Sequence, residues 1–117
     1  RLETHGSCAA PAIMKKIMDH VTDPNVGICW NSNPVDLKDG GFEHNFKLLK
    51  DRLGATIHIR ELDWPGYPWQ KLIDELVAMD YQGYLLLECT TKPDDYVAAM
   101  AAQARLLPEM IAKAPAA

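Results

Sequence analysis

The sequence predicts an α/β fold made of four consecutive βα units. Short apolar runs alternate with longer segments in which apolar residues recur at helical spacing. The short runs are apolar at successive positions, which is typical of parallel strands covered on both faces by helices. One helix between successive parallel strands implies right-handed crossovers. This pattern fits either a small open doubly wound sheet or part of a closed barrel.

The first two units are predicted from residues 1 to 54. Residues 1–4 read as a strand and 11–21 as a helix, with Pro11 in its first turn. The second strand is predicted at 26–30 and the second helix at 42–53. Gly54 is a suitable residue to end that helix.

The third and fourth units follow at similar spacing. Strands are predicted at 55–59 and 83–88, and helices at 68–79 and 93–112. The inner face of the last helix is expected to carry Tyr96, Met100, Gln103, Leu107, Met110 and Ile111. Residues 1–113 are thus predicted to form one domain, followed by a disordered tail at 114–117.

Composition restricts the class of partner. The net charge is −4 and the basic residues are scattered, which argues against a nucleic-acid partner. No apolar run approaches the roughly 20 residues needed to span a bilayer, so no membrane partner is expected. Cys8, Cys29 and Cys89 are expected to be buried thiols in a reducing, cytoplasmic setting, with a disulfide as the alternative. The first residues, Arg1-Leu2-Glu3, read as the end of a strand, and we expect an N-terminal portion to precede them.

Four polar residues recur at or near the ends of the predicted strands. Glu3, Asn31, His58 and Glu88 are separated by 28, 27 and 30 residues. A (β/α)8 TIM barrel of about 250 residues averages about 31 residues per unit, and its chemistry lies at the carboxyl ends of the strands. Two carboxylates, an amide and an imidazole meeting there would suit Mn²⁺, Mg²⁺, Co²⁺ or Zn²⁺. The alternative is that each residue simply begins a solvated loop, or that His58 is a hydrogen-bonded core histidine.

Four segments carry a resemblance to a known family. Residues 2–6, 25–31, 57–63 and 81–88 resemble the xylose isomerase-like TIM barrels, a group of sugar phosphate isomerases and epimerases. The resemblance covers nearly the whole chain and implies the C-terminal half of the barrel, strands five to eight. It implies metal ligation by Glu3, His58 and Glu88, with Asn31 in the place of the family's Asp. Pro34 stands where many relatives have a further His.

The resemblance implies a metal-dependent sugar or sugar phosphate isomerase or epimerase. Such enzymes move a proton next to a carbonyl through an enediolate, with Glu3 and Glu88 as the implied acid/base pair. His5, Arg60 and Trp64 are candidate substrate contacts. The alternatives are a solvated or capping role for His5 and ion pairing of Arg60 with Glu61 or Asp63. Trp30 could join Trp64 in an apolar wall for a sugar ring, but core packing is the expected role of Trp30.

The expected partners are a carbohydrate substrate and either the missing N-terminal half-barrel or a second copy of the chain. The chain alone is expected to have little activity, because loops of the other half would contribute to the pocket. The main alternative function is a non-catalytic barrel remnant or sugar-binding module with a degenerate metal site. A phosphodiesterase with several metals is less favoured, since only four His are present.

Overall fold

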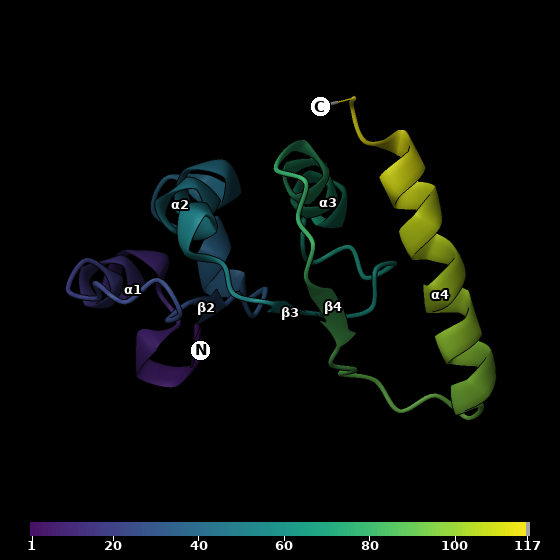
Figure 1. Cartoon of the computed structure of the whole chain (residues 1–117). Helices are drawn as coiled ribbons and strands as arrows, with labels where there is room; N and C mark the ends of the chain where they lie inside the picture. The colour runs from purple at the N-terminus through teal and green to yellow at the C-terminus, as the bar shows by residue number, and fades with distance from the viewer. Residues whose placement is uncertain (117) are drawn as a thin grey trace. The chain divides into compact units, whose positions relative to one another are not determined.

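The computed structural model describes residues 1–116 and has an α/β fold in which strands and helices alternate (Figure 1). The strands are β1 (Leu2–Glu3), β2 (Ile28–Cys29), β3 (Thr56–Ile59) and β4 (Tyr84–Leu87). The α-helices are α1 (Pro11–Met18), α2 (Gly41–Leu49), α3 (Trp69–Ala78) and α4 (Tyr96–Lys113). Short 3-10 helices are η1 (Gly6–Cys8), η2 (Pro34–Leu37) and η3 (Lys50–Arg52).

The chain divides into two units. The first contains Arg1–Ile59 together with Gly83–Leu86, and the second contains Arg60–Gln82 together with the chain from Leu87 onward. The first unit therefore holds β1, β2, β3 and most of β4, with α1 and α2. The second holds α3, α4 and the segments that precede them.

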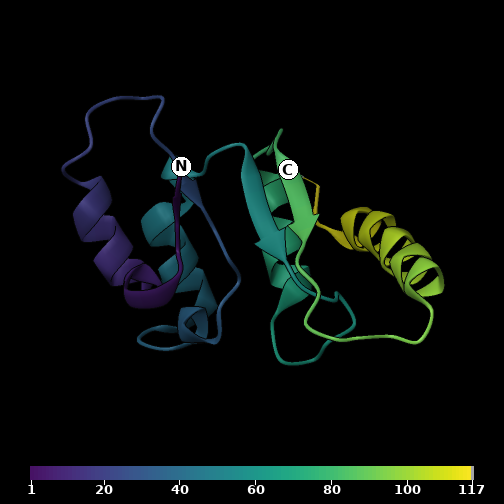
Figure 2. The same ribbon diagram turned by 90° about the horizontal axis from the view of Figure 1, so that it is seen from below.

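The strands of the first unit pair in sequence order. β1 and β2 are parallel, with Leu2 opposite Ile28 and Glu3 opposite Cys29. β3 and β4 form a second small sheet and lie side by side in Figure 2. Backbone hydrogen bonds also link the region of β2 to that of β3, since Gly54 donates to Ile28 and His58 donates to Trp30.

The core of the first unit is built on three aromatic rings. Trp30 is fully buried and meets Phe46 edge-on with ring centroids 5.1 Å apart. Phe42 stacks on Phe46 at 5.5 Å and also meets Trp30 edge-on. Edge-to-face pairs of this kind contribute about 0.5–1.5 kcal/mol beyond the burial of their area. The expected core role of Trp30 is confirmed.

In the second unit, hydrogen bonds of glutamine side chains join α4 to α3 and to the segment before α3. Gln70 on α3 donates to the Met110 carbonyl at 2.9 Å. Gln103 on α4 accepts from the Leu62 amide at 2.7 Å and donates to Asp63 at 2.9 Å. The side-chain oxygen of Asp95 caps α4 by accepting from the Ala98 amide.

The predicted elements are all present, but several end earlier than the sequence suggested. α1 stops at Met18 and not at 21, because the chain turns at residues 19–20, before it reaches Pro24. α2 ends at Leu49, followed by the 3-10 turn η3. Gly54 does not end the helix. It lies against Gly27, where a Cβ would be only 2.9 Å from the Gly54 Cα, so glycine is required for this close approach.

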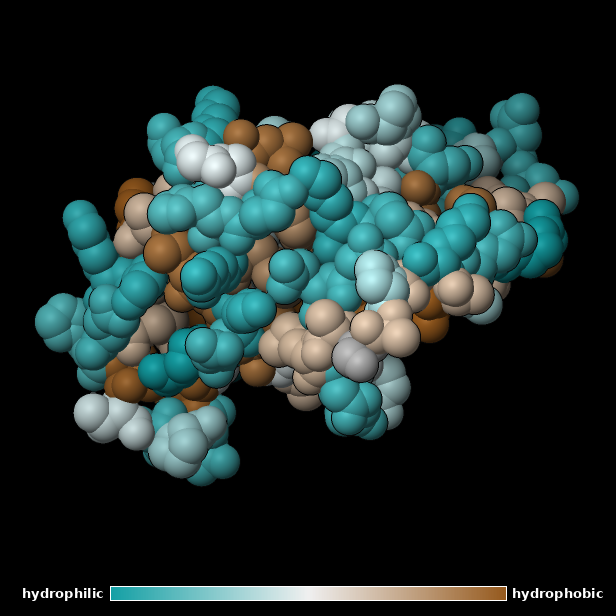
Figure 3. Space-filling model, turned by 90° about the horizontal axis from the view of Figure 1, so that it is seen from above, coloured by the Kyte–Doolittle hydropathy of each residue, from teal (hydrophilic) through white to brown (hydrophobic). Residues whose placement is uncertain are grey.

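Two apolar surfaces expected to be covered are exposed. Tyr84 and Leu86, alternate residues of β4, are 71% and 44% exposed, so β4 is not buried on both faces. On α4, Tyr96 and Met100 are more than half exposed, contrary to the inner-face prediction. Figure 3 shows hydrophobic residues among the hydrophilic ones on one face of the molecule. These faces of β4 and α4 are exposed because no other element within residues 1–116 packs on them.

The expectation of buried thiols holds only for Cys29. Cys8 is half-buried at the end of η1 and Cys89 is exposed in the loop after β4, because neither lies within a strand. All three are free, so the alternative of a disulfide among them is wrong. Residues 114–116 follow α4 without a helix or strand, and residue 117 of the predicted tail lies outside the described residues. Within residues 1–116, no helix has both the length and the apolar character required to cross a membrane.

Candidate metal centre

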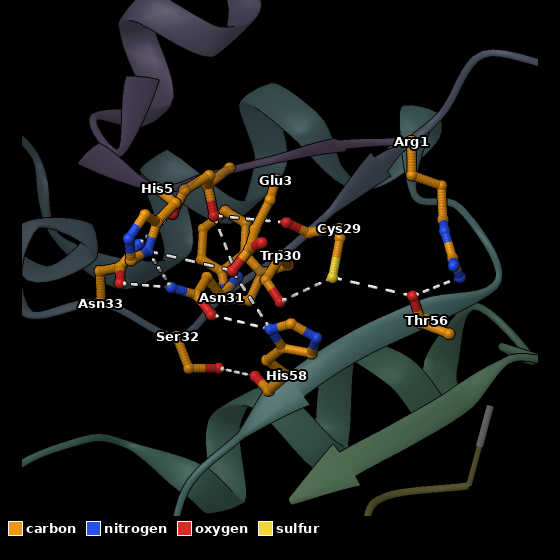
Figure 4. A network of polar contacts seen from close by, with 11 residues as sticks. Arg1, Glu3, His5, Cys29, Trp30, Asn31, Ser32, Asn33, Thr56 and His58 are labelled. Carbon is orange, nitrogen blue, oxygen red and sulfur yellow. Dashed lines mark hydrogen bonds and ion pairs between the residues drawn. The ribbon is translucent and has the colours of Figure 1, made fainter. Parts of the chain in front are cut away.

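Three of the four residues predicted at strand ends lie together in the first unit. Glu3 ends β1, Asn31 follows β2 by two residues, and His58 lies in β3. β1 and β2 pair in parallel, and the hydrogen bond from the His58 amide to the Trp30 carbonyl brings β3 beside the residues that follow β2. The prediction that strand-end positions would gather is therefore realised for Glu3, Asn31 and His58 (Figure 4).

The potential ligand atoms of these residues converge. His58 Nδ1 lies 3.3 Å from Glu3 Oε1 and 3.1 Å from Asn31 Oδ1. Adjacent ligands of an octahedral ion bound at about 2.1 Å would be about 3 Å apart, so this spacing fits a small divalent cation. One nitrogen and two oxygens form a donor set suited to Mn²⁺, Mg²⁺, Co²⁺ or Zn²⁺.

The same atoms are compatible with a hydrogen-bonded arrangement that contains no ion. In that arrangement a hydrogen on His58 Nδ1 would be shared between the two oxygens. The Glu3 side chain is 40% exposed and that of His58 is 25% exposed, so solvent and small ligands reach the cluster. Asn31 is only 3% exposed and forms its buried side.

Hydrogen bonds between side-chain amides fix Asn31 on its buried side, away from Glu3 and His58. Asn31 Nδ2 donates to Asn33 Oδ1 at 3.0 Å and contacts His5 Nδ1 at 3.3 Å. Asn33 Nδ2 in turn donates to the backbone carbonyl of Thr4. The backbone N–H of Asn31 donates to the Thr4 hydroxyl at 2.9 Å. Buried amides with such complete pairing occupy one defined orientation.

Ser32 forms the turn between Asn31 and Asn33. Its φ of +56° lies in the left-handed region, which is uncommon for a residue with a side chain. Its hydroxyl donates to the His58 carbonyl at 2.8 Å. This bond ties the turn after β2 directly to the backbone of the histidine that it faces.

Glu88 is the first residue after β4 and belongs to the second unit, where it is exposed. His5 contacts Asn31, and its side chain is 73% exposed, which leaves most of the ring accessible to a ligand. Arg60, a candidate substrate contact, falls just beyond β3, which ends at Ile59. Its Nε is buried and bonds to none of the described residues.

Glu61 has a role that the sequence did not indicate. Its carboxylate accepts hydrogen bonds from the amide and hydroxyl groups of both Thr90 and Thr91, at 2.7–3.0 Å. Burial by itself would raise the pKa of Glu61, but the hydrogen bonds from Thr91 and Thr90 outweigh it and lower the pKa to about 2. Glu61, one of the two expected alternative partners of Arg60, is thus engaged by the loop after β4.

Trp64 lies at a pocket of about 490 Å³ within the second unit. The indole is 39% exposed and covers Gly66, where a Cβ would be 2.1 Å from the ring. Carboxylates of Glu61 and Asp63 and the ring of Tyr96 also line this pocket. The predicted accessibility of Trp64 to a ligand is compatible with this position.

Sequence reasoning missed Thr4, Ser32, Asn33 and Glu61. In the sequence, Asn31, Ser32 and Asn33 form the polar segment that directly follows the second predicted strand. Three consecutive residues that favour turns and side-chain-to-backbone bonds were the available signal. Glu61 carried no comparable signal, because its partners lie 29 and 30 residues further along the chain.

Comparison with known protein families, with curated proteins and with solved structures found no significant match to the chain.

Proposed function

We propose that the chain is a metal-dependent isomerase or epimerase of a sugar or sugar phosphate, built as the C-terminal half of a (β/α)8 barrel. The convergence of Glu3 Oε1, Asn31 Oδ1 and His58 Nδ1 carries the proposal. The barrel assignment is supported by parallel β1 and β2 and by the continuation of strand pairing in sequence order.

Glu88 is proposed as the fourth ligand. It follows β4 directly, and the Tyr84 amide of β4 donates to the Ala55 carbonyl just before β3. Since neighbouring parallel strands carry their carboxyl ends to the same edge, the residue after β4 is suited to serve the same ion as His58.

Glu3, Asn31, His58 and Glu88 would hold a divalent cation, which would supply Lewis-acid stabilisation of the negative charge that develops on the substrate when a proton is removed next to its carbonyl. The chain's carboxylates would move the proton. Glu3 or Glu88 would take it from the carbon next to the carbonyl, and either the same carboxyl or the other one, if protonated, would deliver a proton back. Delivery to the former carbonyl carbon, with transfer of the neighbouring hydroxyl proton to the former carbonyl oxygen, gives isomerisation. Delivery to the opposite face of the original carbon gives epimerisation. His5, Arg60 and Trp64 are proposed substrate contacts.

Metal binding is tested by thermal unfolding with Mn²⁺. A ligand at 100 times its Kd stabilises the folded state by about 2.7 kcal/mol. We expect this stabilisation in the wild type and its loss in Glu3→Gln and His58→Gln. His44→Gln, on the exposed surface of α2, is the matched control and should retain it. An unshifted wild-type transition at millimolar Mn²⁺ would exclude the metal centre.

A second candidate is a sugar-binding module that has lost catalysis. The internal hydrogen bonding of Asn31 favours it, since the amide is satisfied without an ion and brings no charge. Wash-in of solvent deuterium next to the carbonyl of a ketose separates the two functions. Exchange that requires Mn²⁺ and Glu3 supports the isomerase, and binding of sugar without exchange supports the module.

The proposed partner besides the carbohydrate is the other half of the barrel, from a preceding segment or a second copy. The chain by itself is expected to turn over slowly, so deuterium exchange is the more sensitive assay. A cytoplasmic location stays a prediction.

A further inference from the structure

The side-chain amide of Asn31 is ambiguous as a ligand, because one end of it is an oxygen and the other an NH₂ group. Only the oxygen can bind a cation. Which end faces Glu3 and His58 therefore decides whether residue 31 supports a metal or repels it. Nothing in the Asn31 side chain itself makes that choice.

The orientation of the Asn31 side chain follows from the backbone carbonyl of Thr4, through Asn33. A backbone carbonyl can only accept, so the end of Asn33 that meets the Thr4 carbonyl must be its NH₂ group. The side-chain oxygen of Asn33 then faces Asn31 and can only accept, so Asn31 must donate to it from its own NH₂ group. The oxygen of Asn31 is left facing His58 Nδ1, at 3.1 Å.

We propose that Asn33 is a positioning residue that fixes the Asn31 amide with its oxygen towards the metal centre. Its relevance to metal binding rests on the proposed function. The hydrogen bonds that run from the Thr4 carbonyl through Asn33 to Asn31 form a relay. This relay is buried, with Thr4 fully covered, Asn31 3% exposed and Asn33 9% exposed. Water therefore does not compete for these bonds, and reversing one amide would set oxygen against oxygen or NH₂ against NH₂.

The position of Asn33 is itself secured by the local fold. Its backbone amide donates to Asp36 Oδ2 at 2.7 Å, in a reciprocal capping box at the start of η2. Asp36 is fully buried, and its backbone carbonyl accepts from Asn45 Nδ2. The relay thus runs from a rigid turn to the exposed edge of the strands.

Two substitutions separate orientation from packing. Asn33→Leu removes both the acceptor for Asn31 and the donor to Thr4. Asn33→Asp loses the donor to Thr4 but keeps an acceptor that still selects the NH₂ end of Asn31. We expect Asn33→Leu to weaken Mn²⁺ binding about 10–100-fold, the usual range when a group that orients a ligand is lost. We expect Asn33→Asp to bind Mn²⁺ as the wild type does or more tightly.

Gln70→Leu is the matched control, since Gln70 is a half-buried amide residue outside these contacts that donates to Asp74 and to the Met110 carbonyl. It should lower thermal stability without changing Mn²⁺ affinity. All affinities are measured at a temperature where each variant is folded. Wild-type affinity in Asn33→Leu, or equal losses in Asn33→Leu and Asn33→Asp, would overturn the proposal.

The orientation is also tested without metal, by nuclear Overhauser contacts from the Asn31 side-chain NH₂ group. In the wild type these should reach the His5 ring, whose Nδ1 lies 3.3 Å from Asn31 Nδ2. Contacts to His5 should be lost in Asn33→Leu. Strong contacts from the NH₂ group to the His58 ring in the wild type would overturn the assignment. Failure of Mn²⁺ to bind while the His5 contacts are present would refute the metal centre and leave the orienting role intact.

Discussion

At the scale of single residues, position 31 combines two demands that a carboxylate could not meet together. Asn31 offers an oxygen to His58 and an NH₂ group to Asn33. A carboxylate would keep the first contact but would set its second oxygen against Asn33 Oδ1. The neutral Asn31 side chain therefore brings no formal charge but satisfies the hydrogen bonds of the buried turn better than a carboxylate would.

Asn31→Asp tests this balance. We expect the metal-free protein to be destabilised by about 1–3 kcal/mol, the range for leaving a buried polar group unsatisfied. The added charge should restore much of that loss when Mn²⁺ is present. Chemical denaturation with and without Mn²⁺ measures both effects, and a metal-free variant as stable as the wild type would contradict the argument.

Glu61 makes a second residue-scale prediction. Because its folded pKa of about 2 lies below the ordinary value of 4.5, its hydrogen bonds contribute stability that is fully present above about pH 4.5. That contribution is lost as the pH falls from 4.5 through 2. Glu61→Gln should therefore show less acid destabilisation than the wild type over this range, measured as the difference in unfolding free energy. Glu109→Gln, at an exposed site on α4, should follow the wild type.

At the scale of elements, α4 depends on its first turn. No residue of this helix is buried, so packing contributes less to it than to α3. Asp95 accepts from the Ala98 amide at 2.9 Å and satisfies one of the donors left open at the helix start. Pro108 lies inside the helix and removes one intrahelical bond.

Asp95→Ala should accordingly lower stability by about 1 kcal/mol, the typical effect of losing a cap. Asp94→Ala is the control, since Asp94 is an exposed neighbour outside the cap. Hydrogen exchange of the α4 amides reports the effect locally. Equal protection in the two variants would show that the cap is not what sustains this helix.

At the scale of the whole molecule, the exposed apolar positions predict association. Tyr84 and Leu86 project from β4 with 71% and 44% of their surface exposed. A sheet face of this kind is normally covered by another element or chain. We expect the isolated chain to self-associate at micromolar concentration in sedimentation experiments.

Leu86→Ser combined with Tyr84→Ser should shift the distribution towards monomer. Ile13→Ser, at a similarly exposed apolar site on α1, is the control and should not. A wild-type chain that sediments as a stable monomer would contradict the pairing of half-barrels.

The extent to which sequence predicted this molecule varies with the kind of residue. Trp30 and the order of the four βα segments were predictable, because apolar runs and helical spacing are local properties of the chain. The predicted ends of α1 and α2 lie three and four residues beyond the observed ones. The balance between a turn and a further helical residue depends on only a few positions, so the sequence pattern does not fix it. The gathering of Glu3, Asn31 and His58 was predictable from their regular spacing, whereas the assistance from Asn33 was not.

The sequence by itself determined which residues form strands and helices and which polar groups occupy the strand ends, because both follow from the order of side chains along the chain. Only the tertiary structure decided which atoms meet. The direction of the Asn31 amide follows from the carbonyl of Thr4, 27 residues earlier, and the charge state of Glu61 from hydroxyls 29 and 30 residues later. Hydrogen bonds depend on distance and angle in space, and those are set only when separate segments pack together.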